Sequence, residues 1–270
     1  MNRRLQTDEN PVLADFLTPV QAAPACGAIA LPAERAIVLS EIIPAGTFQK
    51  KNGVRSTGKR EQALTRDAQF IIRRNGEYHV IAESYFYKTE PYYTILSLEY
   101  EGKQVKPASS AVLDAYVTPI CLERAKAGGV PVCEWGISQA YVPLPAILYG
   151  LSYYATNADY AVVKDQVAAK DRIRHITNNG KYPFCFQKFP EGAEVLECTA
   201  IFGKTCNADG SIASHASILY EIFGLPLVKM VFVNDAGSYS LSSLSPLRYS
   251  QLTEQERAIL CAHISAQESL

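Results

Sequence analysis

The segment from residue 77 to residue 107 constrains the fold most, because it reads as a strand, a loop, a helix and a second short strand in direct succession. The pair Asn75-Gly76 just before it is a common hairpin signal, which places another strand upstream. Pro91 suits the first turn of the predicted helix, where its missing N–H costs nothing, and Gly102 suits the left-handed position that ends it. The pattern predicts a right-handed βαβ unit near residues 77–107.

The rest of the chain alternates further strands and helices, with no internal repeat and no clear linker. Apolar runs predict strands at residues 69–74, 184–188, 194–202, 227–233 and 239–244. Periodic or capped segments predict helices at residues 110–126, 162–176, 212–223 and 253–265. Residues 146–155 fit a helix or a strand equally well. We therefore expect the α+β class: a single domain with a mixed sheet, the βαβ unit, and a C-terminal β-hairpin followed by a helix.

The N-terminal part of the chain differs in composition from the remainder. Residues 1–25 are polar and then rich in Ala and Pro, which predicts an N-terminal arm before a single α+β domain over residues 26–270. A first strand is predicted at residues 36–43. Residues 49–66 are predicted to form a flexible basic loop, because residues 49–60 carry five basic side chains and two glycines. Contact with phosphate or RNA is the alternative interpretation of this loop.

The bulk composition disfavours two classes of partner. The formal net charge is −1 over 270 residues, which gives no reason to expect a nucleic acid as the main partner. No apolar stretch approaches the roughly 18–20 residues that span a bilayer, and the start of the chain lacks the apolar run of a signal peptide. The seven cysteines are scattered without metal-ligand spacing, which is typical of reduced thiols. We expect a cytoplasmic protein with no membrane contact.

Residues 84–93, between the first strand and the helix of the predicted βαβ unit, are rich in aromatic side chains. We call this segment the aromatic loop. In such units this loop and the helix N-terminus border the usual ligand crevice, and the first-turn amides can hold a carboxylate or a phosphate. We therefore select as candidate ligand-binding residues Tyr85, Tyr87, Lys88, Tyr92 and Tyr93, with Lys88 as the counter-charge to a carboxylate. The structural alternative is that most of these rings only pack in the core or at its rim.

The sequence carries no complete catalytic or metal-binding motif. The run Gly-Lys-Thr at residues 203–205 looks like the end of a phosphate-binding P-loop, but that motif needs a glycine where Cys198 stands. The four histidines show no metal-ligand spacing, so we expect no metal site. A short loop could bring Cys206 to His215, but nothing local marks either residue as activated. The sequence therefore identifies no catalytic residues.

Several short motifs follow one another in the order found in a known family. They are YFY at residues 85–87, YYTILSLEYEGKQV at 92–105, a Pro and a Ser at 107 and 109, IFG at 201–203, FGLPLVK at 223–229 and LSPL at 244–247. Through them, residues 78–252 resemble the RimK-like ATP-grasp N-terminal domain family, whose domain is usually fused to a RimK-like ATP-grasp ligase. The resemblance implies an α+β fold and a role in binding or positioning a substrate for peptide-bond formation. The resemblance covers about two-thirds of the chain. Near residues 125–195 this sequence has a longer middle section than we expect for the family, and we expect the ligase module to be missing.

If the C-terminal half were a degenerate ATP-grasp module, it would need side chains that bind MgATP, and the sequence offers poor ones. Magnesium-bound phosphates require hard oxygen ligands, usually carboxylates and an Asn, at the ends of paired strands. Residues 227–246 have the strand–turn–strand pattern, but the corresponding end carries only the hydroxyl groups of Ser240, Ser242, Ser243 and Ser245. We therefore expect no cofactor for the isolated chain, and MgATP only if it acts as a ligase.

The leading hypothesis from the sequence is a non-catalytic ligand-binding or partner domain. It would hold an amino acid, a peptide or another carboxylate, and it would work with a separately encoded ATP-grasp ligase. The first alternative is an enzyme in its own right, either a divergent ATP-dependent carboxylate-amine ligase or a cysteine-dependent transferase. The second is an RNA-associated protein that acts through residues 50–60. A resemblance in fold alone does not decide between them.

Overall fold

The computed structural model describes residues 64–66, 68–153 and 155–266, and all of them belong to one compact unit, Lys59–Leu270. The predicted arm at residues 1–25, the predicted strand at residues 36–43 and the predicted basic loop up to residue 63 lie outside the described residues. The described part combines helices with one mixed and two antiparallel sheets, which confirms the α+β class. None of the helices in this part is long and apolar enough to cross a membrane.

The predicted βαβ unit is present. Its elements, with the strand that precedes it, are β1 (Phe70–Arg74), β2 (Glu77–Ile81), α1 (Glu90–Tyr100) and β3 (Val105–Lys106). The sheet has the order β1-β2-β3, with β1 antiparallel and β3 parallel to β2. Asn75 and Gly76 have φ angles of 50° and 81°, and this left-handed pair forms the hairpin turn that the sequence predicts. The aromatic loop therefore leaves the carboxyl end of β2, as expected.

The middle of the chain forms a second, antiparallel sheet in the order β4-β7-β5-β6. Its elements, together with one helix, are β4 (Trp135–Ser138), β5 (Ala146–Gly150), β6 (Ala161–Val163), α4 (Gln166–Ile176) and β7 (Phe184–Lys188). Residues 146–155, which fit a helix or a strand, begin as strand β5. The helix predicted at residues 162–176 begins only at Gln166, because residues 161–163 pair with β5 and Asp165 caps the helix with its side chain.

The C-terminal part forms a third sheet in the order β11-β10-β8-β9. Its elements, together with two helices, are β8 (Glu194–Ile201), β9 (Lys204–Thr205), α5 (Gly210–Phe223), β10 (Leu227–Asp235), β11 (Ser238–Ser245) and α6 (Glu254–Ser265). The predicted C-terminal hairpin and following helix are confirmed as β10, β11 and α6. Gly224 ends α5 with a left-handed φ of 66°, and Thr253 and Glu256 form a capping box at the start of α6.

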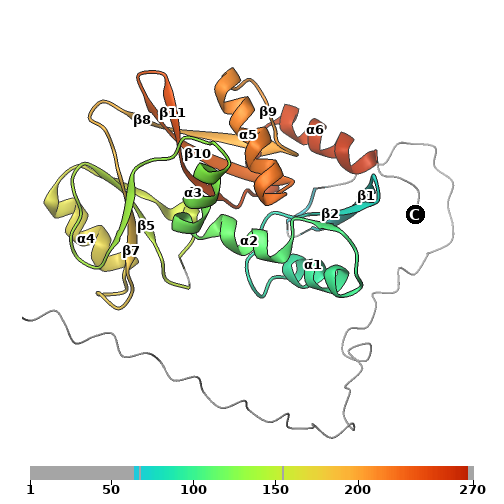
Figure 1. Cartoon of the computed structure of the whole chain (residues 1–270), viewed down its shortest axis with the longest axis horizontal. Helices are drawn as coiled ribbons and strands as arrows, with labels where there is room; N and C mark the ends of the chain where they lie inside the picture. Colours follow the sequence, from blue (N-terminus) through green and yellow to red (C-terminus); the bar gives the residue numbers. More distant parts are fainter. Residues whose placement is uncertain (1–63, 67, 154, 267–270) are drawn as a thin grey trace, which may run out of the picture. The chain divides into compact units, whose positions relative to one another are not determined.

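Four short elements connect these sheets: α2 (Ser109–Tyr116), α3 (Thr118–Ala127) and the single turns η2 (Asn157–Asp159) and η3 (Tyr249–Gln251). The main core lies between α1, α2, α3 and α5 on one side and strands β10 and β11 on the other. Figure 1 shows α1 beside the first sheet and α2 and α3 leading from it to the third sheet. This packing brings the loop at the end of β2 close to the segment that follows β11.

Strand β5 shows how the second sheet is buried on both faces. Its side chains alternate in direction, as the pleat of a strand requires. Ile147 and Tyr149 belong to one core cluster with Val233 of β10, whereas Ala146 and Leu148 belong to another with residues of α4. The second sheet is therefore covered by α4 on one face and by the third sheet on the other (Figure 1).

Candidate ligand-binding site

Tyr85 holds the aromatic loop in place from inside the core. Its side chain is fully buried. Its hydroxyl donates to the Val80 carbonyl at 3.0 Å and accepts the Ala82 N–H at 2.9 Å, so one side chain ties the loop back onto β2. Burial raises the pKa of Tyr85 well above its usual value, which keeps the hydroxyl protonated and able to donate. The role of Tyr85 in this structure is therefore to shape the loop.

The other predicted residues divide between core and surface. Tyr92 is 6% exposed, whereas Tyr87 and Tyr93 are 50% and 52% exposed. Lys88 has a left-handed φ of 71°, and its ammonium lies 5.4 Å from the ring centroid of Tyr87 and 5.8 Å from that of Tyr153. Tyr92 lies edge-on to both Tyr87 and Tyr93, with ring centroids 5.7 Å and 6.5 Å apart. The structure therefore brings Tyr87, Lys88, Tyr92 and Tyr93 together, whereas Tyr85 turns into the core, and the ligand-binding role of all five stays a prediction.

A cavity of about 670 Å³ opens beside this loop, at the carboxyl end of β2 and the N-terminus of α1. This is the position at which a βαβ pattern predicts a ligand crevice, and we call this cavity the crevice. The aromatic loop contributes Ser84, Phe86, Thr89 and Glu90 to its lining, and the remainder comes from residues near Arg66, from η2 and from the segment after β11. The loop selected from the sequence borders this cavity, but none of the five predicted residues belongs to its lining, and the binding role of the loop stays a prediction.

The lining of this crevice carries charges of both signs. Arg66 and Arg248 contribute guanidinium groups, and Glu83, Glu90 and Asp159 contribute carboxylates. A guanidinium group recognises a carboxylate through parallel charge-assisted hydrogen bonds, and a carboxylate accepts hydrogen bonds from an ammonium group. The crevice is therefore suited to a ligand that carries both kinds of charge, and less to a polyanion.

The backbone around the crevice is fixed by two side-chain hydrogen bonds. Glu83 accepts the backbone N–H of Tyr249 at 2.6 Å, which ties the end of β2 to η3. Thr89 precedes α1, but its hydroxyl donates to the Phe86 carbonyl at 2.7 Å, and α1 has no side-chain cap. The first turn of α1 is therefore uncapped by Thr89, and Pro91 contributes no N–H group to it.

A smaller cavity of about 260 Å³ adjoins the crevice and shares Arg66, Glu83 and Arg248 with it. It also includes Arg257, whose guanidinium donates to the Tyr249 carbonyl at 3.0 Å. The lining of this smaller cavity thus holds three guanidinium groups and one carboxylate. It forms the cationic end of the crevice.

The serine-rich end of β11, a strand of the third sheet, is buried against β5 and β7 of the second sheet. Ser242, Ser243 and Ser245 are fully buried. The Ser242 hydroxyl donates to the Gln187 side-chain oxygen at 2.7 Å and lies 2.6 Å from the Tyr149 hydroxyl, and the Gln187 amide donates to the Ser242 carbonyl at 2.7 Å. These neutral groups therefore satisfy one another. The hydroxyl groups of Ser243 and Ser245 have no hydrogen-bond partner among the described residues.

The cysteine alternative gains no support from the environment of Cys206. Burial and the nearby Glu256 raise the pKa of Cys206, whereas a nucleophilic thiol needs a lowered pKa. His215 of α5 stacks on Phe232 with ring centroids 6.0 Å apart, and burial lowers its pKa. In the part of the chain that the structure describes, no three His, Cys, Asp or Glu residues gather closely enough to hold a metal ion.

No family model matches the sequence, and no curated protein matches it. Solved structures that resemble the chain include ATP-grasp ligases. PsnB in complex with a phosphomimetic variant of its minimal precursor, Mg and ADP is 17% identical over 64% of this chain and 64% of its own, with a TM-score of 0.47. A RimK domain ATP-grasp protein from Sphaerobacter thermophilus DSM 20745 is 14% identical over 66% of this chain and 78% of its own, with a TM-score of 0.49. D-alanine-D-alanine ligase from Helicobacter pylori is 12% identical over 65% of each chain, with a TM-score of 0.47.

This chain thus spans 64% of the length of the PsnB structure. At TM-scores of 0.47 to 0.49 these similarities carry no argument about the activity, ligand or partner of this chain. The resemblance to the RimK-like N-terminal domain family stays a prediction from the sequence.

Proposed function

We propose that this chain binds an amino acid, a peptide or another carboxylate in the crevice beside α1, and that it does so without catalysing a reaction. The observation that carries the proposal is the presence of Arg66 and Arg248 together with Glu90 and Asp159 in the lining of one cavity. The guanidinium groups provide donors for a ligand carboxylate, and the acidic side chains provide acceptors for a ligand ammonium. A zwitterion is the simplest ligand that uses both.

The size of the crevice supports the same class of ligand. Small-molecule sites commonly have volumes of roughly 300–1,000 Å³. The main cavity of about 670 Å³ falls inside that range, and the adjoining cavity of about 260 Å³ extends its cationic end. We therefore infer that a short peptide fits as well as a single amino acid, with its carboxylate toward Arg248.

The buried serines support binding without ATP-dependent ligation. Ser242 is packed against Gln187 and Tyr149, and its neighbours on β11 offer hydroxyl groups where magnesium would need carboxylates. We propose that the protein acts in the cytoplasm as the substrate-binding partner of a separate ATP-grasp ligase and has no cofactor of its own. The chain would bind MgATP only if it acts as a ligase.

Charge reversal at Arg248 tests the proposal. We expect Arg248→Glu to weaken the binding of an amino acid or acidic peptide about tenfold or more, because a hydrogen bond to a charged group contributes about 1.5–3 kcal/mol. The ligand is first found by a thermal-shift screen of the purified protein with the amino acids, short acidic peptides, ADP and MgATP, since a ligand of the native state raises the melting temperature. Titration calorimetry then compares the variant with the wild type.

The matched control is Lys164→Glu, which reverses an exposed positive charge outside the crevice lining. It should leave the affinity unchanged. Equal losses in both variants would mean that the ligand responds only to overall charge, and an unchanged affinity in Arg248→Glu would place the site elsewhere.

A further inference from the structure

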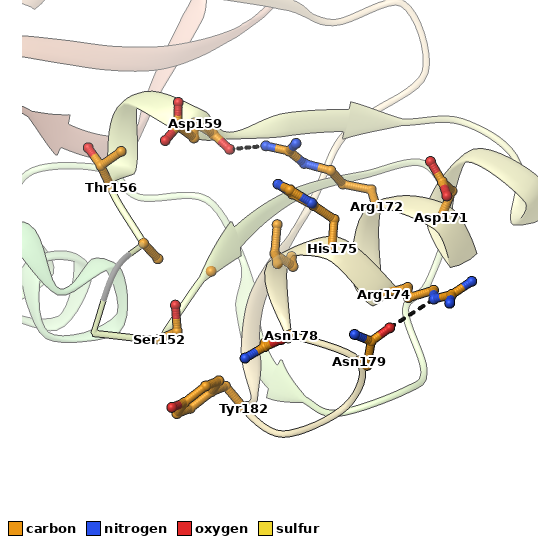
Figure 2. Close-up of a pocket in the computed structure, with 13 residues that line it drawn as sticks. Ser152, Thr156, Asp159, Asp171, Arg172, Arg174, His175, Asn178, Asn179 and Tyr182 are labelled. Atoms are coloured by element: carbon orange, nitrogen blue, oxygen red, sulfur yellow. Dashed lines mark hydrogen bonds between the residues drawn. The ribbon is translucent and has the colours of Figure 1, made fainter.

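A second cavity, of about 770 Å³, lies between the C-terminal half of α4, the turn after α4 and the loop after β5 (Figure 2). It adjoins the crevice beside α1, because Thr156 and Asp159 belong to the lining of both. The function proposed above makes no use of it. Its remaining polar lining comes mostly from α4 and from the turn that follows.

Arg172 is the feature of this cavity that points most directly to a ligand. Its guanidinium donates to the backbone carbonyl of Asp159, which fixes the planar group in one orientation. Its Nε atom is buried and has no hydrogen-bond partner among the described residues. Because solvent does not reach this Nε atom, a ligand would be bound by the terminal nitrogens of the guanidinium group, which give an anion strong, charge-assisted hydrogen bonds.

The turn after α4 brings further donors to the same cavity. Asn178 and Asn179 both adopt left-handed conformations, with φ of 51° and 58°, and the Thr177 hydroxyl accepts the backbone N–H of Gly180 at 2.8 Å. Arg174 donates through Nε to the Asn179 side-chain oxygen at 2.9 Å. This bond leaves the amide NH₂ group of Asn179 and the terminal nitrogens of Arg174 as donors.

The two carboxylates in the lining lie on different sides of His175, and Asp159 lies beside Arg172 (Figure 2). Figure 2 shows His175 in the middle of the labelled side chains, with Ser152 and Tyr182 at one end. Asp171 lies at the opposite end, and Asp159 contacts Arg172 through its backbone carbonyl, not through its carboxylate. The region around Ser152, His175 and Tyr182 therefore presents donor groups with no carboxylate among the labelled side chains.

We propose that this second cavity binds phosphate, either as the free ion or as the phosphate group of a small molecule. A phosphate group carries several strong acceptor oxygens, and the cavity offers a guanidinium, amide NH₂ groups and hydroxyl groups from three segments of the chain. Arg172 is the anchoring residue, and His175 and Ser152 complete the donor set. The site adjoins the carboxylate crevice and shares Thr156 and Asp159 with it, but its anchoring residue, Arg172, does not belong to the crevice lining, so the proposal does not depend on the carboxylate site.

The test is a titration of the full-length protein with inorganic phosphate and with pyrophosphate, followed by calorimetry or by ³¹P line broadening. We expect Arg172→Gln to weaken phosphate binding at least tenfold, while Lys170→Gln, an exposed change on the same helix outside the lining, leaves it unchanged. If circular dichroism shows that Arg172→Gln does not fold, the exposed His175→Asn replaces it and is expected to weaken binding in the same direction. Stronger binding of pyrophosphate than of phosphate, lost in Arg172→Gln, would also support the proposal and would indicate that the cavity takes a diphosphate group.

Three outcomes would overturn the proposal. The wild type fails to bind either probe, or Lys170→Gln lowers the affinity as much as Arg172→Gln does. In the third outcome, Arg248→Glu abolishes phosphate binding while Arg172→Gln preserves it, which would place the anion in the crevice beside α1. The screen for carboxylate ligands is a separate experiment, so failure of one proposal is distinguishable from failure of the other.

Discussion

Replacing Tyr85 with Ala is expected to lower the free energy of unfolding by about 3–5 kcal/mol, the range for removing a buried aromatic ring. The side chain is fully buried, and its hydroxyl pairs both the Val80 carbonyl and the Ala82 N–H. The substitution therefore leaves a cavity and two unpaired backbone groups at the end of β2. Urea unfolding monitored by circular dichroism measures the loss.

Tyr87→Ala is the matched control, because Tyr87 lies two residues away in the same loop and is 50% exposed. Its ring contacts Tyr92 edge-on, with centroids 5.7 Å apart, so we expect a smaller loss of about 0.5–1.5 kcal/mol. Similar losses in the two variants would contradict the division of the aromatic loop into one anchoring ring and exposed neighbours. A small loss in Tyr85→Ala would mean that the loop does not depend on its hydroxyl or its ring.

Gln187→Leu is expected to cost about 1–3 kcal/mol, the usual cost of a buried polar group left without a partner. Gln187 is fully buried and bonds both the hydroxyl and the carbonyl of Ser242. Leu has a similar size but cannot donate to the Ser242 carbonyl, whereas the Ser242 hydroxyl keeps Tyr149 as a partner. Urea unfolding again measures the difference, with Gln166→Leu as the control at an exposed position.

The same network predicts coupling between Gln187 and Tyr149. Both side chains bond Ser242, so the double variant Tyr149→Phe with Gln187→Leu should lose less stability than the sum of the single losses. Strictly additive losses would contradict a shared polar network between β11 and the second sheet. They would also weaken the argument that the serine-rich end is a closed interior.

The sequence predicted well those local features in which a residue type is strongly tied to one backbone conformation. Asn75-Gly76 tolerates the left-handed turn of a hairpin, and Gly224 tolerates the left-handed end of a helix, so both boundaries are readable. Strand β7 was predicted at residues 184–188, where the structure has it. By contrast, β6 was assigned to the following helix, because its apolar residues fit either period and only pairing with β5 decides.

The candidate site was predictable as a place but not as a set of residues. The βαβ pattern predicts the loop after β2, and the crevice lies there. It does not predict which loop side chains turn inward: Tyr85 does so to bond β2, and Tyr87 does not. Arg248 follows β11, far along the chain, and only the packing of β11 against the first part of the domain brings it to the crevice.

The central claim, that this chain binds a carboxylate without using ATP to modify it, is tested most directly by measuring ADP release. The purified full-length protein is incubated with MgATP and with each amino acid or peptide that binds in the thermal-shift screen. We expect calorimetry to detect binding of the carboxylate, and we expect no release of ADP above the level found without protein. ADP release that requires both MgATP and the carboxylate would contradict the account and identify the chain as a ligase.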